Sequence, residues 1–290
     1  MGAWKIGIVG GSGLYQLDAL ENPQWVEVDT PWGRPSDALL TGTIAGTPCV
    51  FLPRHGRGHV LGPSQLNYRA NIDALKRLGV TDLVSISAIG SLTEAMAPGD
   101  FVVVDQFIDR TFARAKSFFG DGLVAHVSMA DPVCPRLSAL LADAATAAGA
   151  KVHRGGTYLA MEGPQFSTRA ESHLYRQWGA QVIGMTAMPE AKLAREAELP
   201  YALVGMVTDY DCWRENEAAV EVEAVIVQLL ANAEKGRNLV AHLAASLPPT
   251  RAASPIDTVL DVALITDPAK RDPALMAKLD AVAGRVLGAP

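Results

Sequence analysis

The sequence contains few cysteines and no long apolar run, and each shortage excludes a class of protein. Cysteine occurs three times in 290 residues, at Cys49, Cys134 and Cys212, without CxxC spacing. This odd, scattered set argues against a disulfide framework and predicts free thiols in a reducing compartment. The amino terminus carries no export signal, and glycines and a proline interrupt the longest uncharged stretch, residues 38–53. We therefore expect a cytoplasmic protein that does not span a membrane.

Positive charge is also scarce. The chain has 25 lysines and arginines against 31 aspartates and glutamates, a net charge of −6 at pH 7. A general nucleic-acid surface needs a dominant basic patch, so we expect a small ligand and no nucleic acid, although a local basic pocket for an anion remains open. Hydrophobic residues make up 49% of the chain, which is enough to bury a substantial core.

Short apolar runs alternate with helical patterns, which is typical of an α/β fold. The runs cover residues 5–9, 49–52, 83–88, 101–104, 157–161, 182–185 and 201–207, and helical patterns cover 65–78, 137–148 and 168–178. Two β-like runs around Ala45-Gly46-Thr47 predict a hairpin, so the sheet should be mixed and not purely parallel.

The domain prediction follows from a change of composition near residue 247. Residues 1–246 should form one domain, and residues 247–290 a proline-rich linker with a helical appendage. A long helix is predicted over residues 217–243, and its apolar residues at three- and four-residue steps should form a mostly buried stripe. Those residues are Val222, Val225, Ile226, Leu229, Leu230 and Ala233.

Two carboxylates, Asp209 and Asp211, directly follow the apolar run 201–207. The carboxyl end of a core strand is where α/β proteins place ligand chemistry. Carboxylates there accept from an exocyclic amine, or donate to a ring nitrogen once protonated. On this pair alone, however, a helix cap near Asn216 and a solvated turn are the favoured interpretation.

Two further segments suggest an anion site. The glycine-rich turn of residues 7–13 lets backbone N–H groups approach a phosphate, although a ligand-free turn explains it equally well. A dinucleotide site is disfavoured because the final glycine of GxGxxG is missing. Residues 53–59, PRHGRGH, read as an anion clamp or, equally, as an exposed basic loop. No metal-ligand set such as HExxH occurs, so we predict no metal.

Hydroxyls and amides also gather where other predicted strands end. Residues 85–91 carry three serines, and residues 161–171 and 184–190 place polar groups where a strand gives way to a helix. A plain strand-to-turn transition accounts for the first segment, and a capping box of Ser167 or Thr168 with Glu171 accounts for much of the second.

Taken together, these segments resemble the 5'-methylthioadenosine phosphorylase family of purine nucleoside phosphorylases. The resemblance runs from Lys5 to Leu243 through GGSG, DTPWGRPSDAL, RHGRGH, NYRANI, PGDFVVVDQFIDRT, EGPQFSTRAE, GMTAMPEA and TDYDCW. It implies a three-layer α/β/α fold with a mixed central sheet and a homo-oligomer, typically a trimer. It also implies phosphorolysis of 5'-methylthioadenosine to adenine and 5-methylthioribose 1-phosphate, with inorganic phosphate as co-substrate and no cofactor.

The resemblance also assigns roles to residues. Asp209, in its protonated form, would be the general acid at purine N7, and Asp211 would share the adenine edge. Phosphate would be held by Ser12, Arg54, His55, Ser87, Ala88 and Thr186. Met185 would lie against the ribose, Phe166 and Ser167 would line the purine site, and the methylthio pocket would comprise Val222, Val225 and Ile226, with His126 from a neighbouring subunit. Serines replace the usual threonines at positions 12 and 87.

Two aspartates at the base favour a 6-aminopurine, because a carboxylate accepts from N6 whereas a 6-oxopurine presents another acceptor. The alternative within the same fold is a methylthioinosine or general purine nucleoside phosphorylase. A nicotinamide-dependent oxidoreductase and a non-catalytic nucleoside-binding module are the alternatives outside it.

Overall fold

The computed structural model describes residues 2–11, 17–215 and 222–288. The strands are β1 (Ile6–Gly10), β2 (Glu21–Val26), β3 (Leu39–Ile44), β4 (Thr47–Pro53), β5 (Asp82–Ser91), β6 (Phe101–Val103), β7 (Gln106–Asp109), β8 (Val152–Arg154), β9 (Thr157–Ala160), β10 (Val182–Gly184) and β11 (Tyr201–Asp209). The helices are α1 (Tyr68–Arg77), α2 (Pro135–Ala147), α3 (Arg169–Gln177), α4 (Ala187–Glu196), α5 (Val222–Ser246), α6 (Pro273–Lys278) and α7 (Asp280–Leu287), with 3₁₀ segments η1 (Pro255–Val262) and η2 (Pro268–Lys270).

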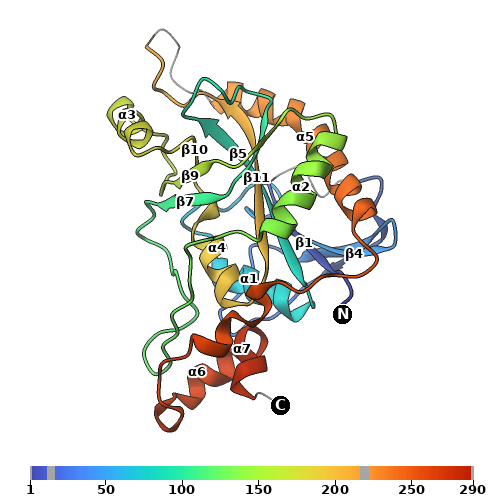
Figure 1. Cartoon of the computed structure of the whole chain (residues 1–290), viewed down its shortest axis with the longest axis vertical. Helices are drawn as coiled ribbons and strands as arrows, with labels where there is room; N and C mark the ends of the chain where they lie inside the picture. Colours follow the sequence, from blue (N-terminus) through green and yellow to red (C-terminus); the bar gives the residue numbers. More distant parts are fainter. Residues whose placement is uncertain (1, 12–16, 216–221, 289–290) are drawn as a thin grey trace.

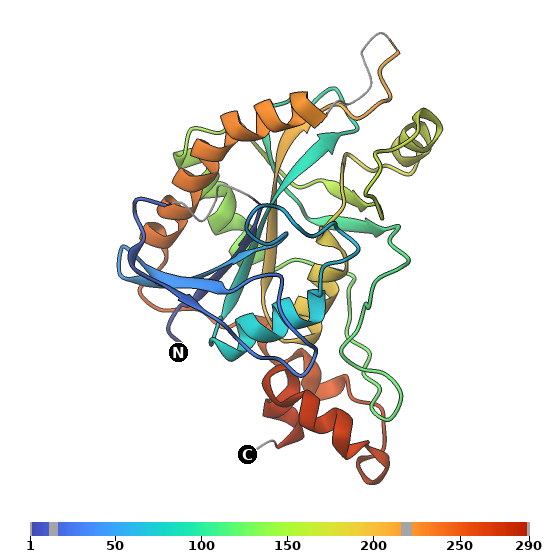
Figure 2. The same cartoon turned by 180° about the vertical axis from the view of Figure 1, so that it is seen from behind.

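One mixed sheet lies between two helical layers (Figure 1). The strand order is β2-β3-β4-β1-β5-β10-β9-β7, while β11 pairs with β5 and β6, and β6 also pairs with β8. Helices α2 and α5 cover one face, and α1 and α4 cover the other, as the reverse view shows (Figure 2). The predicted three-layer α/β/α fold with a mixed sheet is confirmed, and the helices predicted over residues 65–78, 137–148 and 168–178 are α1, α2 and α3.

The central strand β11 is apolar because both of its faces are buried. Successive side chains of a strand point to opposite faces. Tyr201 and Leu203 join the apolar cluster beneath α1 and α4, whereas Ala202 and Val204 join the cluster beneath α2 and α5. A strand covered on both sides reads as a continuous apolar run, which is what residues 201–207 show.

The predicted hairpin is also present. Strands β3 and β4 pair antiparallel from Leu40–Phe51 to Ile44–Thr47. The two turn residues, Ala45 and Gly46, have φ values of 48° and 77°. Positive φ at both central positions gives the turn whose twist matches that of the flanking strands.

The predicted apolar stripe of α5 is wrong in its first half. Val222, Ile226 and Leu230 are 59%, 48% and 69% exposed, and only later residues such as Leu239 and Leu243 enter the core. Helical periodicity reveals an apolar face but does not say whether the same chain covers it. The predicted start at residue 217 lies outside the described residues.

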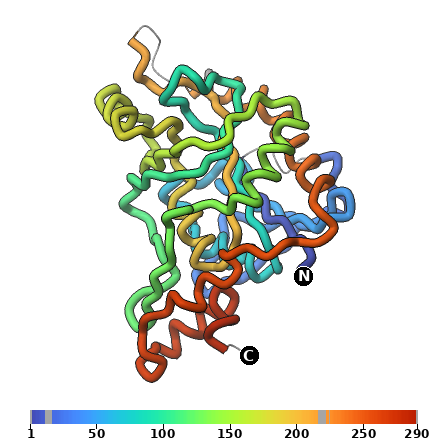
Figure 3. Tube along the Cα trace, viewed as in Figure 1, coloured from blue at the N-terminus to red at the C-terminus, as the bar shows by residue number. Residues whose placement is uncertain are grey.

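After α5 the chain runs back across the molecule as an irregular segment, and residues 255–288 form a helical group at one end, opposite the exposed first turns of α5 (Figure 3). Leu260, Leu279 and Val282 join the cluster beneath α1 and α4. Arg77 of α1 pairs with Asp280 of α7 at the surface of this contact. Among the described helices, none combines the length and the apolar character that a membrane crossing requires.

Leu260 should be the apolar anchor of the tail. It is 0% exposed, so Leu260→Ala leaves a cavity and should lower the free energy of unfolding by about 3 kcal/mol. Val262→Ala is the matched control, because Val262 is 93% exposed and should change the value little. Urea unfolding followed by tryptophan fluorescence measures both, and equal effects of the two variants would contradict this packing.

Candidate active site

The site begins at the carboxyl ends of β5 and β11. These parallel strands run in register from Tyr201–Leu83 to Val207–Ile89, and the register then shifts so that Asp209 lies opposite Gly90. Thr208 is therefore the extra residue of a bulge. Bulges re-aim side chains at the ends of strands, and this one turns the segment containing both predicted aspartates away from regular pairing.

Gly90 makes room for the first carboxylate. A Cβ built on Gly90 would lie 2.9 Å from Asp209 Oδ1 and 3.1 Å from Ile183 Cγ2. A contact under 3 Å forces one partner to move, so any larger residue at position 90 displaces Asp209 or the β10 strand that carries Ile183. The position of Asp209 thus depends on the residue opposite it on β5.

The two aspartates are held close together. The Asp211 amide donates to Asp209 Oδ1 at 2.8 Å, and the Thr208 hydroxyl donates to Asp209 Oδ2 at 2.7 Å. Asp211 has a φ of 54°, a left-handed conformation that this turn imposes. Its Oδ2 atom is buried and makes no hydrogen bond of normal geometry to the described residues, although the Ser167 and Ser172 hydroxyls lie close enough to lower the pKa of this carboxyl. A buried oxygen of this kind is ready for a ligand donor.

Both carboxyl groups favour the protonated form more than a free aspartate does. Burial raises the pKa of Asp209, and the neighbouring Asp211 charge raises it further. Burial also raises the pKa of Asp211. Both aspartates are half-buried, which argues against a fully solvated turn, while the helix start near Asn216 lies outside the described residues.

Hydroxyl groups from two elements meet beside this end of the sheet. Ser87 lies on β5 and Thr186 immediately precedes α4, and their side-chain oxygens are 3.4 Å apart. Ala88 follows Ser87 on the same strand. The structure thus brings together three of the residues expected at the phosphate site.

Arg54 lies next to this group, but most of its N–H groups already donate to acceptors within the protein. Its Nε donates to Glu190 Oε2 at 3.0 Å, and Nη2 contacts Glu190 Oε1 at 3.3 Å and Ser85 Oγ at 2.6 Å. Nη1 donates to the Ile86 carbonyl at 3.1 Å. Glu190 is buried and also accepts from the Tyr201 hydroxyl at 2.9 Å. A guanidinium has five N–H groups, so few remain for an anion, and its charge is balanced by Glu190.

His55 is neutral in this environment. Its Nδ1 lies 2.8 Å from the Leu61 carbonyl oxygen, which only accepts, so Nδ1 carries the proton and Nε2 is an acceptor. Burial, together with the charge of Arg54, lowers the pKa of His55 to about 4. Its ring stacks on His59 at 4.2 Å.

The PRHGRGH segment therefore does not act as one cationic clamp. Arg54 is buried, whereas Arg57 is exposed and pairs with Asp37 at 2.8 Å. The exposed-loop interpretation applies to residues 57–60, whereas Arg54 is buried and His55 half-buried, and for these two residues the anion site stays a prediction. The sequence alone does not tell which part of PRHGRGH is an exposed loop and which part is buried.

The segment before α3 is tied to the loop after β11. The Cys212 thiol donates to the Ser167 carbonyl at 3.2 Å, which places Ser167 next to Asp211. Phe166 beside it is exposed. The predicted capping box is confirmed for Thr168 with Glu171.

Met185 packs against the same region. A Cβ on Gly163, which has a φ of 70°, would lie 2.5 Å from Met185 Sδ. Gly163 therefore serves both the turn and the close approach of the methionine. Met185 directly precedes Thr186, so the expected ribose and phosphate residues are neighbours.

Other predicted site residues do not join this group in a single chain. Ser12 lies outside the described residues. Val222 and Ile226 are exposed on the first turns of α5, and Val225 is half-buried there. His126 is exposed on the loop between β7 and α2, where its amide donates to the Ala263 carbonyl of the tail at 2.9 Å.

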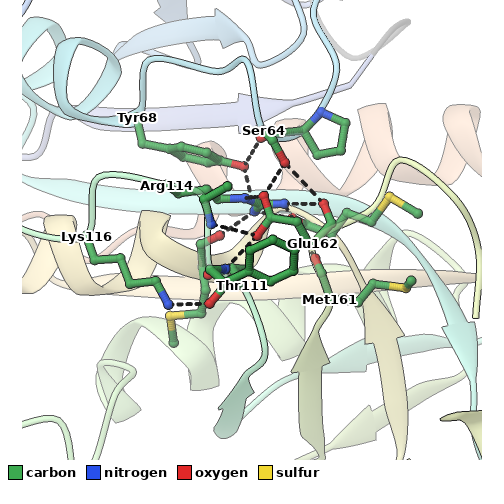
Figure 4. A network of polar contacts seen from close by, with 12 residues as sticks. Ser64, Tyr68, Thr111, Arg114, Lys116, Met161 and Glu162 are labelled. Atoms are coloured by element: carbon green, nitrogen blue, oxygen red, sulfur yellow. Dashed lines mark hydrogen bonds and ion pairs between the residues drawn. The ribbon is translucent and has the colours of Figure 1, made fainter.

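Sequence reasoning missed the polar hub beneath the site, Arg114 with Glu162 (Figure 4). Arg114 donates to the carbonyl oxygens of Met185 at 2.5 Å, Met188 at 2.6 Å and Glu162 at 2.6 Å. Glu162 in turn accepts from the Phe112 amide at 2.7 Å. Glu162 stands in the EGPQFSTRAE motif, but Arg114 lies in an irregular loop that gives no periodic signal.

No group of metal-ligating side chains occurs within the part of the chain that the structure describes. The polar atoms of the site are instead carboxyl, hydroxyl and peptide groups, together with one charge-balanced guanidinium. Such a set suits a nucleoside base on one side and an oxyanion on the other.

Known proteins share this fold and much of this sequence. The family model described as "Phosphorylase superfamily" matches residues 5–245. The chain belongs to the phosphorylase superfamily. Within the superfamily it is 66% identical over 284 residues to S-methyl-5'-thioadenosine phosphorylase of Cereibacter sphaeroides, covering 97% of this chain and 98% of the relative. It is 59% identical to the enzyme of that name from Rhodospirillum rubrum, with 98% and 97% covered. These relatives confirm the family that the motifs indicate.

Solved phosphorylase structures agree. A methylthioadenosine phosphorylase from an antarctic soil metagenomic library has a TM-score of 0.92 and 48% identity, with 97% of this chain and 99% of that one covered. A mutant adenosine/methylthioadenosine phosphorylase from Schistosoma mansoni, in complex with methylthioadenosine, has a TM-score of 0.79 and 38% identity, with 83% and 91% covered. Because the matches to the Cereibacter sphaeroides and antarctic soil proteins cover 97% of the chain, they include most of its tail as well.

The raised pKa of Asp209 predicts a gain in stability when its charge is removed. A carboxyl whose pKa is higher in the folded state destabilises the fold once ionised, so the cost is present above that pKa and absent below the unfolded value. Asn at position 209 keeps a side-chain oxygen that accepts from the Asp211 amide. The Asp209→Asn variant should therefore unfold at a higher urea concentration than the wild type at pH 7. The advantage should shrink as the pH falls through the raised pKa.

Asp280→Asn is the control of opposite sign. The hydrogen bond from Arg77 lowers the pKa of Asp280, so its ionised form stabilises the fold above the unfolded pKa and that contribution is lost in acid. Asp280→Asn should destabilise the protein at pH 7 and have less effect at low pH. The same sign for both variants would contradict the assigned environments.

Proposed function

We propose that this chain catalyses phosphorolysis of S-methyl-5'-thioadenosine, releasing adenine and 5-methylthioribose 1-phosphate. The observation that carries the proposal is the pair of carboxyls with raised pKa, Asp209 and Asp211, at the carboxyl end of the strand that pairs with the Ser87 strand. Relatives named S-methyl-5'-thioadenosine phosphorylase, at 59–66% identity over nearly the whole chain, support it.

The chemical obstacle is the departure of adenine, which leaves poorly as an anion. Protonated Asp209 donates its proton to purine N7 while the bond between N9 and C1' breaks, and the electron pair of that bond stays on the neutral base. A phosphate oxygen forms the new bond to C1' of the sugar, which has acquired positive charge. Asp209 is left ionised and takes up a proton from solvent before the next turnover.

Phosphate binds to Ser12, Arg54, His55, Ser87, Ala88 and Thr186 in this proposal. Because Glu190 balances Arg54, hydroxyl and peptide donors carry much of the binding. Neutral donors orient a dianion without the strong affinity of an unpaired cation, which suits a co-substrate that must react and leave. Inorganic phosphate is a co-substrate here, and no cofactor takes part.

The base is adenine. The buried Asp211 Oδ2 atom accepts from the N6 amine, while a 6-oxopurine would bring a second acceptor to the same oxygen. Phe166 and Ser167 flank the purine, and Met185 lies against the ribose. The Schistosoma mansoni enzyme has been crystallised with adenine and with methylthioadenosine, which agrees with this choice.

Product analysis tests the reaction directly. Purified protein incubated with methylthioadenosine should release adenine only when phosphate is added, and 5-methylthioribose 1-phosphate should accumulate in equal amount. Asp209→Asn should lower turnover by roughly 10²- to 10⁴-fold with little change in the KM for phosphate. Asp143→Asn, an exposed change on α2, is the control. Release of adenine without phosphate, or full turnover by Asp209→Asn, would contradict the mechanism.

The protein acts as a cytoplasmic homotrimer in this proposal. Val222, Ile226, Val227 and Leu230 leave an apolar face of α5 uncovered in one chain, and association is the ordinary way to bury such a face. The methylthio group contacts Val222, Val225 and Ile226, and His126 of a neighbouring copy completes the pocket. A thioether loses no hydrogen bond on entering such a pocket, whereas a 5'-hydroxyl does.

Charge placed on this face should disrupt the assembly. Leu230→Arg should convert a trimer into smaller species in sedimentation velocity, because an arginine in an apolar interface is costly. Asp143→Arg, at an exposed position of α2, should leave the trimer intact. A wild-type protein that sediments as a monomer, or equal behaviour of the two variants, would refute the interface.

A further inference from the structure

A cavity of about 210 Å³ lies between the domain and the tail. Its walls are Lys76, Val80, Thr81, Glu198, Leu199, Arg251, Asp257, Ala281, Val282 and Arg285. Thr81 and Leu199 precede the amino ends of β5 and β11, whereas the aspartates lie at the opposite end of β11. Nine residues of strand span about 30 Å, so this cavity is distinct from the proposed active site.

Two arginines of the wall are fixed by carboxylates. Arg251 donates to Asp257 at 2.6 and 2.9 Å and also pairs with Asp82. Arg285 donates to Glu198 at 2.6 and 2.8 Å. These pairs join the tail to the amino ends of the central strands, and they hold both guanidinium groups in one orientation at the cavity.

Lys76 is the third cation of the wall, and it has no ion-pair partner among the described residues. No acceptor of the described residues lies within hydrogen-bond or ion-pair distance of its ammonium group. The charged groups that face it are Glu198, Asp257, Arg251 and Arg285. The wall itself has three cations and two carboxylates, while Asp82 and Asp261, outside the wall, also pair with Arg251 and Arg285 and leave Lys76 as the wall cation without an ion pair. Burial lowers the pKa of Lys76, because a desolvated ammonium without a partner is costly, and a bound anion would offset this cost.

We propose that this cavity is a second ligand site, for a small molecule that carries a phosphate group. The phosphate binds to the Lys76 ammonium between the two fixed guanidinium groups. The cavity has room for about seven water molecules, more than orthophosphate needs, so a short hydroxylated phosphate ester also fits, with its hydroxyls toward Glu198 and Asp257. Such a ligand contacts α1 and α7 together and fastens the tail to the domain.

Hydrogen exchange with mass spectrometry tests the site at the level of single elements. The probes are inorganic phosphate and ribose 5-phosphate, titrated into the wild-type protein. Peptides of α1 and α7 report the cavity, and peptides ending at Asp209 report the other end of the sheet separately. We expect saturable protection of α7 by at least one probe. Tighter protection by ribose 5-phosphate identifies an ester as the ligand, and equal protection identifies free phosphate.

Three variants decide whether Lys76 holds the phosphate. Lys76→Gln should weaken the α7 protection at least about tenfold, which is the loss of one charged hydrogen bond. Lys76→Arg keeps the charge and should retain protection, which separates the charge from a general effect on folding. Lys278→Gln, an exposed change on α6, should match the wild type. Protection confined to the Asp209 peptides, or equal binding by Lys76→Gln, overturns the proposal.

Discussion

The parallel pairing of β5 with β11 is the constraint on which the proposed site depends. It sets Ser87 and Ala88 on one strand beside the aspartates that follow the other, and the bulge at Thr208 places Asp209 opposite Gly90. The register is firm because both strands are buried on both faces, and a slip by one residue would send every side chain to the wrong layer. The core of the sheet thereby holds the Asp209 carboxyl and the Ser87 hydroxyl in place. The left-handed turn at Asp211 adds the second carboxyl.

Charge balance is the second theme of the site. Arg54 and Glu190 neutralise each other in the interior, burial and the charge of Arg54 keep His55 neutral, and burial raises the pKa of both aspartates. A region with little fixed net charge binds a dianion through oriented dipoles and leaves a carboxyl that stays protonated to higher pH than a free aspartate does. A simple arginine-histidine clamp would favour tighter binding of the anion but not its reaction.

The sequence predicted those parts of the fold and site that depend on local pattern. Residues 201–207 indicated a core strand, and ligand groups gather where such strands end, so Asp209, Ser87 and Thr186 were expected at one end of the sheet; the structure places the Ser87 and Thr186 hydroxyls 3.4 Å apart. Glu190, the partner of Arg54, was not, because 136 positions separate the pair and only the folded chain brings them together. The Arg114 hub was missed for the same reason. The stripe on α5 was recognised, but its exposure was not, since periodicity does not reveal what covers a face.

The loop between β7 and α2 connects the two ends of the molecule. Arg114 holds the carbonyls around Met185, Glu196 accepts from the Phe118 amide at 2.7 Å, and Ala125 forms a bridge with Leu264. Burial raises the pKa of Glu196 to about 7, so the hydrogen bond from the Phe118 amide to Glu196 loses its charge in mild acid. The contacts of Arg114 and the backbone bridge of Ala125 do not change in this pH range. Loosening of the tail is therefore felt along this loop as far as the carbonyl groups around Met185, and mild acid weakens the attachment at Glu196 before the other two.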